Sequence, residues 1–314
     1  NGGMHTHDVI SLTQAGIGAM NRVIDGKPQA VRLAWVVLLA QGHLLIEDVP
    51  GVGKTLLAKA LGRVLGGSVR RIQFTPDLLP ADVVGVNLFN QESRHFEFRP
   101  GPVFANVVIG DEINRASPKT QSAMLECMAE AQISIDGTTH RMPHPFMVVA
   151  TQNPVDMEGT FALPEAQRDR FMARVSLGYP ARSAEVEMLD HHGARDPLSE
   201  LEPVCGPEHI AAAIETVRRV HASPELRGYI VRLVEATRES AEFSLGASPR
   251  ASLHLLRAAK ANAALDGREY ASPDDVQQLA VSILAHRLIP REEGTVEHAA
   301  EALRRILAAV PVIA

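Results

Sequence analysis

The sequence has few cysteines and no long apolar run. These two features argue against a disulfide-rich protein and against a membrane-spanning one. Its 314 residues include only two cysteines, Cys127 and Cys205. Two cysteines cannot build a disulfide framework, and neither lies at the spacing of a Cys/His metal site. The longest apolar run, Leu33–Ala40, is far shorter than the ~20 residues that a membrane-spanning helix needs. Because no signal-peptide pattern is present either, we predict a cytoplasmic protein that makes no membrane contact.

The sequence also lacks an excess of positive charge. Lys and Arg number 31 against 37 Asp and Glu, which gives a net charge of −6. Because binding to a phosphate backbone depends on Lys and Arg, we expect no general affinity for nucleic acid. The 13 histidines are scattered, so no transition-metal site is predicted. With 46% apolar residues, a chain of this length can form two globular domains.

A phosphate-binding loop is the strongest motif in the chain. The apolar segment His43–Glu47 leads into the Gly-rich stretch Asp48–Thr55, and the apolar residues that follow have helical spacing. In a strand, loop and helix of this kind the backbone N–H groups face an anion, Lys54 reaches the terminal phosphates and Thr55 coordinates Mg²⁺. The alternative, a Gly-rich turn with a surface lysine, does not account for the flanking strand and helix. The motif predicts binding of a nucleoside triphosphate.

Two further apolar segments end in polar residues and predict buried parallel strands. Residues 106–112 end in Asp111 and Glu112, and residues 146–151 lead to Asn153. Because the carboxyl ends of parallel strands form the ligand-binding edge of an open sheet, these side chains should meet the phosphates. We expect Asp111 to hold Mg²⁺, Glu112 to deprotonate the attacking water, and Asn153 to contact the γ-phosphate or that water. Taken alone, a terminal carboxylate or an Asn-Pro pair would be ordinary strand or turn chemistry.

Two β-hairpins are predicted to interrupt this α/β pattern. The first spans residues 86–98 around a polar turn, and the second spans residues 133–142 around the turn Asp136-Gly137. Simple strand-to-helix connections do not need such insertions, so we interpret both hairpins as functional additions. The alternative is ordinary surface decoration.

The last third of the chain is predicted to be helical. Strand patterns stop at Pro180, which sets the predicted domains at residues 1–180 and 181–314. Helices are expected to begin at three Ser-Pro pairs, Ser223-Pro224, Ser248-Pro249 and Ser272-Pro273. Arg250 places a cation in the first turn of its helix, where the helix dipole favours anions, so we interpret it as a candidate phosphate ligand.

Another helix is expected to begin at Pro164. It carries Arg168 and Arg170 among acidic residues, a pattern typical of a salt-bridged, solvated face.

With these motifs placed, nearly the whole sequence resembles the MoxR family of AAA+ ATPases. The matching segments occur in the family's order along the chain: residues 42–55, 73–80, 101–106, 111–116, 150–154, 163–167, 169–171 and 246–251. The resemblance implies a P-loop NTPase core of α/β class with a central parallel sheet and two inserted hairpins, followed by a small all-α lid domain. It identifies the hairpins with the helix-2 insert and the pre-sensor-1 hairpin of this clade.

The resemblance also assigns roles to single residues. It implies a Walker A loop at Asp48–Thr55, a Walker B pair at Asp111 and Glu112, a sensor 1 at Asn153 and a sensor 2 at Arg250. Arg170 would be the arginine finger offered to the neighbouring subunit, although Arg168 stands where the family has an apolar residue and competes for that role. The implied nucleotide contacts are Val23, Ile24, Pro50, Gly51, Val52, Gly53, Lys54, Thr55 and Leu56, and the implied metal ligands are Thr55 and Asp111.

The function implied is a ring-forming, hexameric ATPase that uses ATP and Mg²⁺ to remodel or mature a partner protein. Proteins similar to this one act beside partners with von Willebrand factor A-type domains, in metal insertion or complex assembly. A nucleic-acid motor of the same clade is the first alternative, and the acidic charge balance disfavours it. An ATP-gated assembly scaffold is the second, and the presence of Glu112 argues against it.

Overall fold

The computed structural model describes residues 4–47, 54–152, 163–179, 181–190, 196–292 and 294–313. The strands are β1 Leu44–Glu47, β2 Val69–Gln73, β3 Gly85–Asn90, β4 His95–Pro100, β5 Val107–Asp111, β6 Gln132–Ile135, β7 Thr138–Arg141, β8 Met147–Gln152, β9 Ala173–Val175, β10 Phe243–Leu245 and β11 Ile289–Pro290. The α-helices are α1 Thr6–Asn21, α2 Pro28–Leu39, α3 Lys54–Leu65, α4 Pro80–Val84, α5 Pro118–Glu130, α6 Glu165–Arg168, α7 Arg182–Asp190, α8 Pro207–Arg218, α9 Pro224–Glu239, α10 Pro249–Leu265, α11 Pro273–Leu284 and α12 Val296–Ala309. The 3-10 helices are η1 Ile113–Arg115, η2 Pro197–Glu200 and η3 Ala285–Arg287.

A five-stranded parallel sheet organises the first part of the chain, with strand order β2-β5-β8-β1-β9. Strands β1, β5 and β8 are buried along their whole length, as their continuous apolar runs predict. Alternate side chains enter two cores: Leu44 and Ile46 pack with α1, α2 and α3, while Leu45 packs with α4 and α5 on the other face. The predicted central parallel sheet is therefore confirmed.

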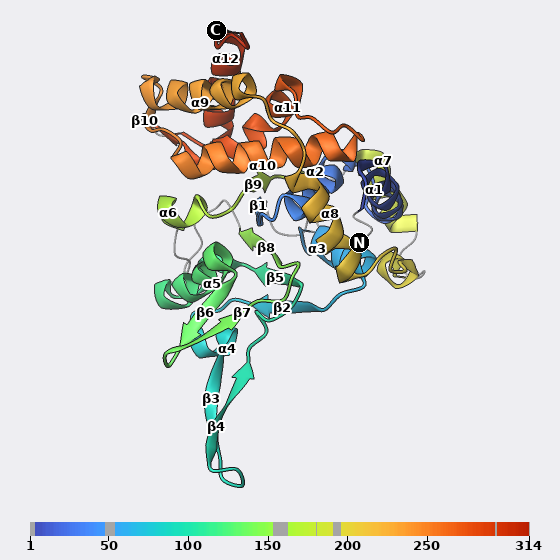
Figure 1. Cartoon of the computed structure of the whole chain (residues 1–314), viewed down its shortest axis with the longest axis vertical. Helices are drawn as coiled ribbons and strands as arrows, with labels where there is room; N and C mark the ends of the chain where they lie inside the picture. Colours follow the sequence, from blue (N-terminus) through green and yellow to red (C-terminus); the bar gives the residue numbers. More distant parts are fainter. Residues whose placement is uncertain are drawn as a thin grey trace.

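Both predicted hairpins are present. Strands β3 and β4 pair from Gly85↔Pro100 to Asn90↔His95, and they project away from the sheet (Figure 1). Strands β6 and β7 pair around the turn at Asp136 and Gly137, both of which have positive φ, as a type I′ turn requires.

The C-terminal helices form a layer on the opposite side of the molecule from the hairpins (Figure 1). Helices α9, α10 and α11 begin at Pro224, Pro249 and Pro273, as the Ser-Pro pairs predict. The expectation of helices alone misses β10 and β11, which form a short antiparallel pair. Helix α7 begins just after the predicted boundary at residue 181, but α8 packs against α1 and α2 as well as α10. The exact domain division stays a prediction.

Two other expectations differ in detail. The helix expected from Pro164 is short, α6, and Asp169 just beyond it contacts the C-terminal helices instead of forming a solvated face. Of the described helices, none combines the length and the apolar character needed to cross a bilayer.

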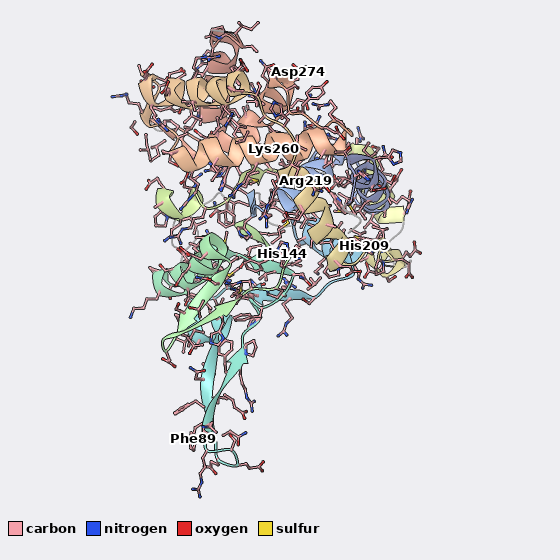
Figure 2. All side chains as sticks on the ribbon, viewed as in Figure 1. Phe89, His144, His209, Arg219, Lys260 and Asp274 are labelled. Carbon is pink, nitrogen blue, oxygen red and sulfur yellow. The ribbon has the colours of Figure 1, made fainter. Side chains whose placement is uncertain are left out.

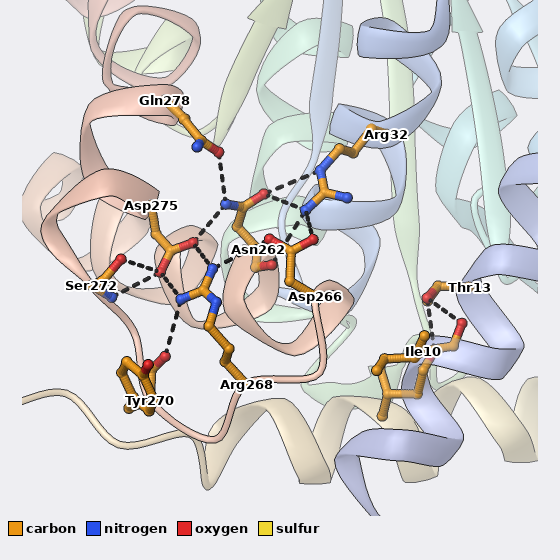
Figure 3. Close-up of polar contacts among 11 residues, drawn as sticks. Ile10, Thr13, Arg32, Asn262, Asp266, Arg268, Tyr270, Ser272, Asp275 and Gln278 are labelled. Atoms are coloured by element: carbon orange, nitrogen blue, oxygen red, sulfur yellow. Dashed lines mark hydrogen bonds and ion pairs between the residues drawn. The ribbon is translucent and has the colours of Figure 1, made fainter.

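A buried polar network fastens the C-terminal helices to α2 (Figure 3). The fully buried Asp275 accepts hydrogen bonds from Arg268 at 2.6 and 2.7 Å, from Asn262 at 2.7 Å and from the backbone N–H of Ser272 at 2.8 Å. Asn262 in turn accepts a 3.0 Å bond from Arg32 of α2. Burial alone would raise the pKa of Asp275, but the bonds from Arg268, Ser272 and Asn262 outweigh it and lower that pKa.

We expect Asp275→Ala to lower the free energy of unfolding by about 3 kcal/mol, because it leaves the Arg268 guanidinium and the buried Asn262 amide without their buried partner. The exposed neighbour Asp274 gives a matched control, Asp274→Ala, with little effect. Because the folded-state pKa of Asp275 lies below the unfolded one, its contribution is present above the ordinary carboxyl pKa and is lost as pH falls through the folded value. Denaturant melts at pH 7 and pH 3 should therefore show a smaller difference between wild type and variant at pH 3. An equal difference at both pH values would contradict the assignment.

Candidate nucleotide-binding site

The carboxyl ends of β1, β5 and β8 meet at one edge of the sheet, where sequence analysis places the phosphates. Glu47 of β1 lies in register with Gln152 of β8, whose side-chain amide donates to the Glu47 carboxylate. Arg174 of β9 contacts the same carboxylate at 3.5 Å. The edge thus brings together polar groups from three parallel strands above a buried apolar sheet.

The predicted phosphate loop connects this edge to α3. Strand β1 ends at Glu47 and α3 begins at Lys54, so the flanking strand and helix are both where the motif requires them. Thr55 and Leu56 lie in the first turn of α3. Asp48, Pro50, Gly51, Val52, Gly53 and the Lys54 side chain lie outside the described residues, as does Asn153. Their roles stay predictions.

Asp111 ends β5 as a buried carboxylate, 3% exposed. The guanidinium of Arg71, from the neighbouring strand β2, forms an ion pair with it, and the Thr151 hydroxyl of β8 lies 3.4 Å away. A carboxylate that already holds a cationic group can exchange it for a metal ion, and carboxylate and hydroxyl oxygens are the ligands that Mg²⁺ prefers. Asp111 and Thr55 therefore fit the predicted metal site by their chemistry.

Glu112 has a left-handed backbone conformation, with φ of 54°. Its N–H donates to Thr151 Oγ1 at 3.1 Å, which holds the turn against β8. Its carboxylate accepts bonds from Gln73 at 3.3 Å and Arg115 at 3.2 Å. Residues in this strained region cluster at functional sites because the surroundings must hold them there.

A junction between the sheet domain and the C-terminal helices is built from Asp169, Ser248, Arg250, His254 and Arg287, which we call the Asp169 junction. Asp169 accepts bonds from Arg287 at 3.0 Å and from the Ser248 hydroxyl at 3.0 and 3.1 Å, and Arg250 lies 3.6 Å away. Arg250, predicted to be a phosphate ligand, thus contacts a carboxylate in this structure.

Two groups of the Asp169 junction have lowered pKa values. Burial lowers the pKa of Arg287 to about 10, although Asp169 opposes that change. Burial and the neighbouring Arg287 lower the pKa of His254 to about 2, so its imidazole is neutral and can accept a bond from Arg287.

Val23 and Ile24, the two predicted nucleotide contacts outside the phosphate-loop region, lie after α1. Ile24 is buried and Val23 half-buried, and the N–H groups of both bond to Met20 O at 2.9 and 3.0 Å. A cavity of about 720 Å³ begins at Gly26, between α2, the end of β9 and helices α10 and α11. The cavity therefore begins close to these two residues along the chain, but neither Val23 nor Ile24 is part of its lining.

Comparison with known proteins agrees with this geometry. Residues 43–173 match the ATPase family associated with various cellular activities (AAA), and residues 235–306 match the AAA lid domain. The uncharacterized protein YeaC of Bacillus subtilis is 45% identical over 98% of this chain and 97% of its own length. Chaperone MoxR1 of Mycobacterium tuberculosis is 42% identical over 89% of this chain and 76% of its own length. This chain belongs to the MoxR family of AAA+ ATPases.

A solved structure supports the same fold for the MoxR-family chain. A protein from Cytophaga hutchinsonii, described as a candidate ATPase, superposes with a TM-score of 0.86 at 36% sequence identity. The match covers 96% of this chain and 95% of that one. The resemblance seen in the sequence is confirmed, and the residues at the sheet edge belong to an ATP-binding fold.

Sequence reasoning missed several residues of this MoxR-family site. Arg71 and Gln73 contact Asp111 and Glu112, the two predicted Walker B carboxylates, and both come from β2, which was not predicted. Residues at i and i+2 lie on the same face of a strand. This spacing could have been used only if residues 69–73 had been predicted to form a strand. His254 and Arg287 of the Asp169 junction had no local sequence signal.

Proposed function

We propose that this protein is a Mg²⁺-dependent ATPase that assembles into a ring, with hexameric stoichiometry, and remodels a partner protein. The observation that carries the proposal is the edge of the sheet, where buried β5 brings Asp111 and Glu112 to the same edge as β1, the strand that enters the phosphate loop, with β8 between the two strands. In this scheme Lys54 contacts the terminal phosphates, Glu112 accepts a proton from the attacking water, and Asn153 and Arg250 contact the γ-phosphate. Arg170, or Arg168 in its place, reaches the ATP of the neighbouring subunit.

Thr55 and Asp111 would hold Mg²⁺, which would neutralise charge on the phosphates. For Glu112 to act as a base, its carboxylate must be free to reach the water. Gln73 is exposed and the Arg115 side chain is 44% exposed, so water can replace the bonds that they donate to Glu112 at low cost.

The two hairpins support a protein partner because they form a single unit with an apolar end. Asn87 of β3 donates to Asp136 of the second hairpin at 2.8 Å. Phe98 of β4 stacks on His140 of β7, with ring centroids 3.8 Å apart.

The far end of the first hairpin, where Figure 2 labels Phe89, carries an exposed pair of aromatic side chains, Phe89 and Phe96. Phe89 is 52% and Phe96 71% exposed, and their rings meet edge to face at 5.3 Å. Exposed apolar groups that project in this way are typical of protein-binding surfaces. Along the chain, only η1 and α5 separate Glu112 from the second hairpin.

We expect Phe89→Ser with Phe96→Ser to leave basal ATP turnover unchanged and to reduce partner-stimulated turnover by about tenfold, the loss expected for removing a binding hot spot. The probe is a co-purified protein with a von Willebrand factor A-type domain. Val231→Ser, at an apolar position on α9 that is 44% exposed, is the matched control and should keep full stimulation. Chelation of Mg²⁺ should stop turnover in all variants.

Single- and double-stranded DNA and RNA, tested at two salt concentrations, should not stimulate hydrolysis. Salt-sensitive stimulation by nucleic acid that disappears in the double variant would instead support a nucleic-acid motor.

A further inference from the structure

The Asp169 junction contains more positive than negative charge. One carboxylate, that of Asp169, faces the guanidinium groups of Arg250 and Arg287, and the neutral His254 adds no charge. The single carboxylate cannot fully neutralise both guanidinium groups. The two arginines also differ in how many contacts hold them in place.

Arg287 is fixed in place. Its side chain is 1% exposed, and it donates to the backbone carbonyls of Phe171 at 2.9 Å, Met172 at 3.2 Å and Ile283 at 2.8 Å as well as to Asp169. Removing it from this position would leave several buried acceptors unsatisfied. Arg287 therefore holds Asp169 to the C-terminal helices whatever happens at the nucleotide.

Arg250 is held loosely. Its side chain is 42% exposed, and its 3.6 Å contact with Asp169 is its one ion pair among the described residues. Both carboxylate oxygens of Asp169 already accept a bond from Ser248, and one also accepts from Arg287, so little acceptor capacity remains. An anion with greater charge can draw Arg250 away without breaking the other contacts.

We propose that Asp169 is a positioning residue that competes with the γ-phosphate of ATP for Arg250. Without that phosphate, Arg250 of the lid pairs with Asp169; with it, Arg250 moves to the phosphate while Arg287 and Ser248 keep Asp169 in place. Because Asp169 lies between Arg168 and Arg170, the exchange changes the charge beside both candidate fingers. This inference rests on the proposed ATPase function.

The test compares the affinities of a non-hydrolysable ATP analogue and of ADP. Asp169→Asn removes the competing charge and keeps an oxygen for Arg287 and Ser248. Because an exposed ion pair changes an equilibrium by roughly two- to fivefold, affinity for the ATP analogue should rise by that factor relative to ADP. In an Arg250→Ala background the same substitution should leave the ratio unchanged.

A second variant predicts the opposite sign. Ser248→Ala frees lone pairs on Asp169, which should then hold Arg250 more tightly and reduce the preference for the ATP analogue. Glu242→Gln, which breaks the exposed ion pair with Arg305 elsewhere in the lid, is the matched control and should leave the ratio unchanged.

Three results would each overturn the inference. Asp169→Asn could change the affinities for the ATP analogue and ADP equally, or could change their ratio just as much in the Arg250→Ala background. Ser248→Ala could also shift the ratio in the same direction as Asp169→Asn. If the wild-type protein binds and hydrolyses ATP while these ratios stay constant, only this inference fails. If it binds neither nucleotide, the proposed function fails as well.

Discussion

We expect Glu112→Gln to abolish ATP hydrolysis while ATP stays bound. We expect Lys54→Ala to abolish both ATP binding and ATP hydrolysis. These are the largest effects among our predictions. Glu112 is the carboxylate that follows buried β5 in a strained left-handed turn, and the glutamine amide cannot take a proton from water. Loss of a general base reduces turnover by about 10²–10⁴-fold. Lys54 begins α3 directly after the phosphate loop, so its loss removes the cation that the terminal phosphates require.

Phosphate release and equilibrium binding of ATP, measured on the same samples, separate the two failures. The exposed Glu130 at the end of α5 gives the matched control, Glu130→Gln, which should hydrolyse at the wild-type rate. A Glu112→Gln enzyme as fast as wild type would remove Glu112 from the role of base.

Arg170→Ala should erase the rise of specific activity with protein concentration that ring formation produces. An arginine finger supplied by a neighbouring subunit contributes about 10³–10⁵ in rate. In this structure Arg168 and Arg170 are both half-buried beside Asp169, and the Nε atoms of both make no hydrogen bond within the described part of the chain. We therefore test both positions, with Arg168→Ala as the direct comparison.

Mixing decides whether the arginine acts across an interface. We expect Arg170→Ala subunits and Lys54→Ala subunits to be inactive by themselves, whereas a mixed ring contains some interfaces with an intact loop and an intact finger. Turnover should return in the mixture and pass through a maximum as the ratio of subunits changes. A mixture that assembles but stays inactive at every ratio contradicts the assignment of Arg170, and recovery with Arg168→Ala in its place transfers the role to Arg168.

The core of the fold could be predicted because its strands are apolar along their whole length. Strands β5 and β8 are fully buried, so their sequences carry the signal without any knowledge of neighbours. Strand β2 has one buried residue, Ile72, and reads as a polar segment because it lies at the sheet edge. Strands β9, β10 and β11 have three residues or fewer, too few to show a period.

Site residues could be predicted where the functional groups belong to one short sequence motif. They could not be predicted where the site depends on contacts between segments that are far apart in the sequence. Asp111 and Glu112 follow a strand in sequence, and Arg250 stands out because it violates the charge preference of its own helix. The partner of Arg250 is Asp169, 81 positions earlier in the numbering, and the anchor Arg287 comes from a third segment. Nothing local in any of the three segments indicates that they meet.

The strand order has a consequence for how the chain is made. Among the described strands, β1 pairs only with β8 and β9. Leu44 therefore cannot join the sheet until its partners Val149 and Ala173 have been synthesised. At about 5–20 residues per second the apolar strand and the neighbouring α2 stay without their sheet partners for roughly 5–20 s after they leave the ribosome. Such long-range parallel pairing is slow and exposes apolar surface to other chains. Cooler expression should therefore raise the yield of folded protein, because apolar association between unfinished chains weakens at lower temperature.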